Sequence, residues 1–81
     1  MTHALKTVSP FFADVVDGKK TFEVRKNDRN FKVGDKLLLQ EWTGEEYTGK
    51  EWEGEVTYLL TDGAYCKKGF VVMGIKEKEI Q

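Results

Sequence analysis

The apolar residues of this chain fall into short runs, and glycines or polar turns end each of them. Three of these runs, Lys36–Trp42, Trp52–Leu60 and Phe70–Ile75, have the length and partial alternation of β-strands. Eight glycines among 81 residues favour a small and tightly bent sheet. No apolar run approaches the roughly 20 residues that a membrane helix needs.

The N-terminal third of the chain predicts one helix between two further strands. We expect the helix to begin at Ser9, as N-cap, with Pro10 in the first helical position, and to stop at Gly18. The strands are expected at His3–Lys6 and Thr21–Lys26. Four apolar side chains at helical spacing are expected to form one stripe that packs on the sheet: Phe11, Phe12, Val15 and Val16.

These elements make one α+β domain over residues 1–81, with a charged tail at 76–81. We expect a small β-barrel of five or six mostly antiparallel strands with one helix packed against it. Residues 43–50 are predicted to be a hairpin tip and residues 61–69 a loop. Leu37-Leu38-Leu39 predicts a strand that is buried on both faces or one that passes through a barrel wall. Core packing is expected for Trp42 and Tyr58, and Tyr47 is expected to be exposed.

The net charge of −1 hides an uneven distribution along the chain. Residues 19–36 carry a balance of +4, whereas residues 37–81 carry −4. Such polarity can attract an anion to one side of a small domain, although exposed strand faces are also commonly charged. One cysteine, Cys66, cannot form an internal disulfide, and with one histidine it is too little for a zinc site. We therefore expect a cytoplasmic protein without metal, cofactor or membrane association.

The segment from Gly18 to Arg29 carries the densest group of polar side chains. By the period-two rule Thr21, Glu23 and Arg25 share one face of the strand, and Phe22 and Val24 share the other. A lysine, Lys20, comes just before. Such a patch is either a solvated strand face or a site for a polar, anionic ligand.

The pattern Gly18-x-Lys20-x-x-Glu23-x-Arg25 resembles the signature of the ASCH domain superfamily, a branch of the PUA-like β-barrels. More closely, the chain resembles the family of domains of unknown function DUF3850 over nearly its whole length. The segments that carry this resemblance are His3–Lys6, Gly18–Asp35, Tyr47–Gly49 and Gly69–Val72.

The resemblance implies a PUA-like barrel with a polar cleft between helix and barrel. It also implies RNA binding, with which the superfamily is associated. Some bacterial ASCH proteins hydrolyse the acetyl amide of N4-acetylcytidine, using a lysine that matches Lys20 and a threonine where this chain has Glu23. Those enzymes also use a more distal glutamate, and a carboxylate at position 23 cannot supply the hydroxyl of their threonine.

Three functions follow as hypotheses. The first is a binding module for RNA or a nucleotide-like ligand, in which Glu23 orients the cations rather than forming an ordinary surface pair with Arg25. The second is a small amidohydrolase acting on a modified nucleoside, with Lys20 and Glu23 as catalytic candidates. The third is a protein-interaction domain that uses the acidic residues 41–55. The candidate ligand-binding residues are His3, Lys6, Lys20, Glu23, Arg25, Arg29 and Tyr47.

Overall fold

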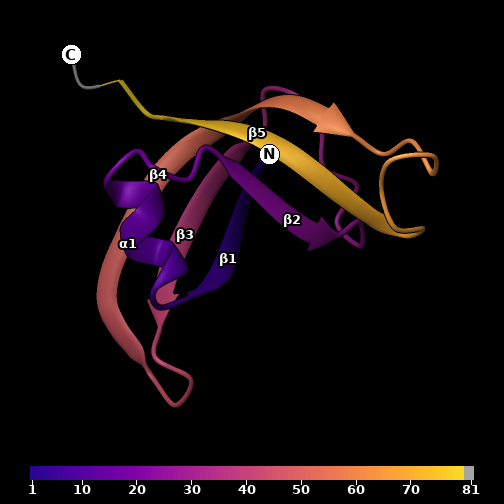
Figure 1. The fold of residues 1–81 in the computed structure, drawn as a ribbon. Helices are drawn as coiled ribbons and strands as arrows, with labels where there is room; N and C mark the ends of the chain where they lie inside the picture. Colours follow the sequence, from indigo (N-terminus) through magenta and orange to yellow (C-terminus); the bar gives the residue numbers. More distant parts are fainter. Residues whose placement is uncertain (80–81) are drawn as a thin grey trace.

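The computed structural model describes residues 1–79, which form a curled half-barrel sheet of five strands and one short helix (Figure 1). The sheet order is β1-β3-β4-β5-β2, in which β1 runs parallel to β3 and all other neighbours are antiparallel. The expected small, mostly antiparallel sheet with one helix is therefore confirmed, with five strands. The elements are β1 (Thr2–Val8), α1 (Phe11–Val16), β2 (Phe22–Lys26), β3 (Lys36–Trp42), β4 (Tyr47–Leu60) and β5 (Phe70–Glu77).

The long strand β4 gives the sheet its curl. Its first part pairs with β3 and its second part with β5, so one strand of 14 residues joins the two halves. The register shifts between Gln40 and Trp42 and again between Val56 and Tyr58. Such irregularities bend a strand and increase its twist. As a result β1 and β2, which occupy opposite ends of the sheet order, come to lie beside each other (Figure 1).

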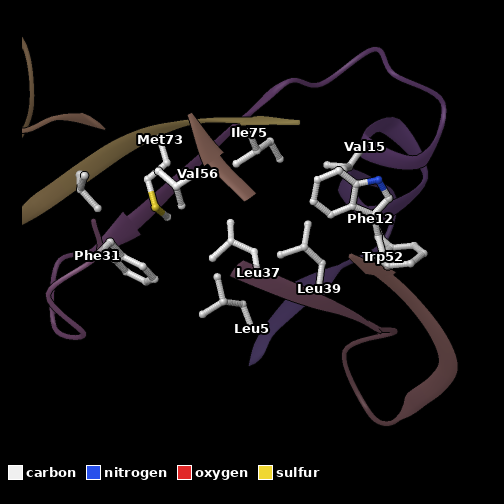
Figure 2. Close-up of a cluster of buried hydrophobic side chains, with 11 residues drawn as sticks. Leu5, Phe12, Val15, Phe31, Leu37, Leu39, Trp52, Val56, Met73 and Ile75 are labelled. Atoms are coloured by element: carbon white, nitrogen blue, oxygen red, sulfur yellow. The ribbon is translucent and has the colours of Figure 1, made fainter. Parts of the chain in front are cut away.

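The inner face of the curl holds the hydrophobic core. Leu37 and Leu39 of β3 and Met73 of β5 are almost fully buried. Figure 2 shows Leu5 beside these leucines, with Phe12 and Trp52 together at the helix end. In β1 the odd-numbered residues point inward and the even-numbered ones outward, as the alternation of a strand requires.

The helix differs from the sequence-based expectation in two ways. It has six residues, and no side chain caps its start, because the Ser9 hydroxyl donates a 2.8 Å hydrogen bond to Glu41 instead. Only Phe12 and Val15 of the apolar stripe are buried, whereas Phe11 and Val16 are exposed. A helix of less than two turns can press only one narrow side against the sheet. Gly18 does end it, in the left-handed region at φ 76°.

Several boundaries and core assignments are also corrected. Strand β4 already begins at Tyr47, so the hairpin tip is shorter than predicted. Leu38 is half-buried rather than buried, Trp42 is half-buried, and Tyr58 is 67% exposed. The predicted charged tail at 76–81 overlaps β5, which continues to Glu77, and residues 80–81 of that tail lie outside the described residues. Within residues 1–79 no helix has the length and hydropathy to cross a membrane.

Candidate functional site: a polar cleft at the seam of the half-barrel

A small cleft of about 280 Å³ opens where β1, β2 and the start of α1 meet. This volume lies just below the usual range for small-molecule sites, about 300–1,000 Å³, so the cleft suits one small group rather than a large ligand. Its lining combines charged and apolar side chains, namely Lys6, Thr7, Val8, Phe11, Lys20, Glu23, Val24 and Arg25.

Glu23 is the buried centre of this cleft, with only 3% of the residue exposed. Its Oε1 accepts a 2.8 Å hydrogen bond from Lys20 Nζ, and its Oε2 accepts a 3.0 Å bond from Arg25 Nε. Lys20 Nζ also donates to the Phe22 carbonyl at 2.7 Å. Both carboxylate oxygens therefore have cationic partners, which is what a buried charge requires.

The strand geometry of β2 explains why this carboxylate is inside. Glu23 lies on the inner face of β2, and its neighbours Phe22 and Val24 point outward and are about half exposed. The face of β2 that carries Glu23 and Arg25 is thus its buried face. A surface ion pair, the alternative that the sequence left open, is excluded because Glu23 is buried among its partners.

Arg25 also joins β2 to β1. Its Nη2 donates to the Lys6 carbonyl at 2.9 Å and to the Thr7 hydroxyl at 3.2 Å. In the loop that follows β2, Arg29 Nη1 donates to the Ala4 carbonyl at 2.9 Å. In a parallel pair alternate residues face the partner strand, and the others present their carbonyls to the free edge. Two guanidinium groups therefore occupy the free edge of β1 and close the seam of the half-barrel.

The rim of the cleft is apolar. Phe11 is 54% exposed, Val24 51% and Val8 45%. An exposed aromatic ring beside charged groups is a common partner for a planar base, because every base has a π-face. The cleft therefore offers ionic hydrogen-bond donors at its floor and apolar contact at its edge.

Lys6 connects the cleft to the β3–β4 hairpin. Its Nζ lies 4.0 Å from the centroid of the Trp42 ring and 5.8 Å from that of Tyr47. The two rings pack edge to face at 4.9 Å. Tyr47 is exposed as expected, but it lies beside the cleft and does not line it.

The structure places His3 in the core, away from the cleft. Its Nε2 donates a 2.8 Å hydrogen bond to the Asp35 carboxylate, and its ring packs edge to face on Phe31. The hydrogen bond from His3 holds the pKa of Asp35 below its ordinary value of 3.8, helped by the Lys32 backbone N–H. His3 is thus positioned as a structural residue, although the sequence placed it among the ligand-binding candidates.

Four of the candidates predicted from the sequence, Lys6, Lys20, Glu23 and Arg25, line this cleft, but the other half of its lining was not predicted. Thr7 and Val8 were left out because the first strand was expected to end at Lys6. The β-branched side chains of Thr7 and Val8, which favour strands, were the signal available for extending it. Phe11 was expected to pack on the sheet, and Val24 was expected on the face of its strand opposite Glu23. Among the described residues 1–79 no group of three or more metal-ligating side chains is present.

Comparison with known proteins gives a relative in a bacteriophage. The uncharacterized 12.9 kDa protein in the GpA 3' region of Escherichia phage P2 is 42% identical to this chain over 55 residues. The matched segment is 68% of this chain and 50% of the phage protein, so the chain spans about half the length of that relative. A model of the family DUF3850, a domain of unknown function, matches residues 2–75. The chain described here therefore belongs to the DUF3850 family.

Proposed function

We propose that this protein binds RNA or a nucleotide-like ligand in the cleft between β1, β2 and α1, as a PUA-like module related to the ASCH superfamily. The observation that carries the proposal is the buried Glu23 that fixes Lys20 and Arg25 beneath an exposed aromatic rim. Preorganised cations lose little conformational freedom when a ligand arrives.

The cations retain donors for such a ligand. Lys20 Nζ has three N–H groups and uses two of them, for Glu23 and for the Phe22 carbonyl. Arg25 Nη1 has no hydrogen-bond partner within residues 1–79. These donors suit a phosphate or the acceptor edge of a base, and Phe11 is positioned for stacking.

We favour binding over amide hydrolysis for a chemical reason. Lys20 Nζ forms an ion pair with Glu23, and an ammonium in such a pair has no lone pair with which to take a proton. The carboxylate of Glu23 is also engaged in ion pairs, since each of its oxygens accepts a hydrogen bond from a cation.

Binding should be measured by fluorescence anisotropy with short labelled RNAs, with nucleosides including N4-acetylcytidine as competitors. Phe11→Ala removes the rim ring without touching Glu23, and we expect it to weaken binding by about fivefold or more, the effect of losing one stacked base. Val16→Ala is the matched control, because Val16 is equally exposed on the same helix but lies outside the cleft.

Three results would contradict the proposal. The first is an absence of binding by the unchanged protein. The second is equal loss in Phe11→Ala and Val16→Ala. The third is turnover of N4-acetylcytidine, which would move the assignment to the amidohydrolase. Capture of a protein partner through residues 41–55, insensitive to nuclease, would favour the protein-interaction function instead.

A further inference from the structure

A second hollow lies on the same seam, next to the cleft. It measures about 250 Å³ and has a mostly polar lining that includes Lys26, Asp28 and Arg29. Arg25 lines both hollows, so they adjoin along β2. Lys26 and Arg29 are exposed, and within residues 1–79 the Arg29 guanidinium makes one hydrogen bond, to Ala4, so its other donors have no partner there.

The loop between β4 and β5 adds two more cations at this end of β2. The Asn27 N–H donates to the Gly69 carbonyl at 2.9 Å, and Lys26 pairs with Phe70 across the strands. This pairing brings Lys67 and Lys68, which directly precede Gly69 and are exposed, to the end of β2.

Basic side chains from residues 19–36 and from the otherwise acidic residues 37–81 therefore gather at this side of the molecule. A basic strip runs from the cleft along β2 to the loop, and it consists of Lys20, Arg25, Lys26, Arg29, Lys67 and Lys68. The acidic residues in the two hollows are Asp28 and the buried, ion-paired Glu23, and the loop itself contributes one further carboxylate, Asp62. In contrast, the hollow beside α1 and the end of β5 is lined by four glutamates, Glu51, Glu53, Glu77 and Glu79, against one cation, Lys78, which pairs with Glu53. An anionic chain is thus attracted to one side of the molecule.

We infer that the ligand is a single strand of several nucleotides, with one nucleotide in the cleft and the following phosphates along this basic strip. The inference rests on the proposed function and adds the length and the path of the ligand. The five residues of β2 span about 17 Å at the usual rise of a strand, and the loop cations extend this path further. A mononucleotide would leave those cations unused.

The test compares uridine monophosphate with a labelled six-nucleotide oligouridylate over a salt titration. If about four phosphates are contacted, affinity for the hexamer should fall about 50-fold between about 50 and 200 mM salt. In the double variant Lys67→Ala/Lys68→Ala the fall should be only about sevenfold, because about two contacts are lost. Affinity of this variant for uridine monophosphate should be unchanged.

The control is Lys50→Ala/Lys78→Ala, which removes the same charge from exposed lysines outside both hollows. An equal loss in this control would overturn the inference, because the effect would then follow net charge alone. Equal affinity for monophosphate and hexamer would also overturn it while leaving the proposed function intact. If neither ligand binds, the proposed function itself fails.

Discussion

Arg25 Nη2 donates a 2.9 Å hydrogen bond to the Lys6 carbonyl and so connects two strands from opposite ends of the sheet order. The same guanidinium donates to the buried carboxylate of Glu23 through Nε. One side chain therefore closes the half-barrel and forms the floor of the cleft. Loss of Arg25 should affect both the fold and binding, so weaker binding in an Arg25 variant would not by itself identify a ligand contact.

A substitution at Arg29 tests the contact between β2 and β1 separately from the buried carboxylate of Glu23. Arg29→Ala removes the hydrogen bond to the Ala4 carbonyl and touches no buried charge. We expect the free energy of unfolding to fall by about 1 kcal/mol, the usual contribution of one hydrogen bond. Arg25→Ala should lower it by about 3 kcal/mol, because Glu23 then loses one of its two cationic partners. Urea unfolding curves measure both values, and equal losses would argue against a distinct role for Glu23.

The ion pair between Lys20 and Glu23 should behave as a coupled unit. Lys20→Ala leaves a buried carboxylate with one cationic partner, and we expect a loss of about 2 kcal/mol after allowing for the partial exposure of Lys20. Adding Glu23→Gln should recover part of this loss, because a neutral amide needs no counterion. A double-mutant cycle is expected to give a coupling energy of about 1 kcal/mol or more. Simple additivity would show that the two groups do not interact in solution.

The contact between His3 and Asp35 predicts a pH dependence of stability. The hydrogen bond from His3 lowers the pKa of Asp35 in the folded state below its ordinary value of 3.8. The ionised carboxylate therefore stabilises the fold above that value, and this contribution is lost as the pH falls through the lower folded pKa. Melting temperatures measured from about pH 6 to about pH 2 should fall less steeply in Asp35→Asn. An unchanged slope would mean that other carboxylates account for acid unfolding.

Gly54 is required by the packing of Trp52. A Cβ added at Gly54 would overlap the indole of Trp52 and the Lys76 carbonyl. We expect Gly54→Ala to destabilise the protein by about 2 to 3 kcal/mol, as overpacked cores do. Gly63→Ala is the control, since nothing lies within 4 Å of its added Cβ and its backbone is not in the left-handed region. Thermal unfolding of the two variants should differ clearly.

Local patterns in the sequence predicted the elements that depend on neighbouring residues. The strand Lys36–Trp42 was predicted with its observed bounds, because its leucines and flanking polar turns lie within the strand itself. The predicted start of α1, with Ser9 as N-cap, was wrong because the Ser9 hydroxyl donates to Glu41, which is 32 residues away in the chain. A preference for N-capping cannot anticipate a competing partner on another strand.

In the candidate site, too, local sequence patterns determined some features and contacts between distant segments determined others. The sequence by itself determined that Glu23 and Arg25 share one face of β2, because side chains alternate along any strand. Only the tertiary structure decided that this face is the inner one, and that Lys20 completes the pairing of Glu23. It also decided that β2 lies beside β1, where Arg25 reaches the Lys6 carbonyl. The reason is that alternation fixes which residues share a face, whereas curling of the whole sheet fixes which face is buried and which edges meet.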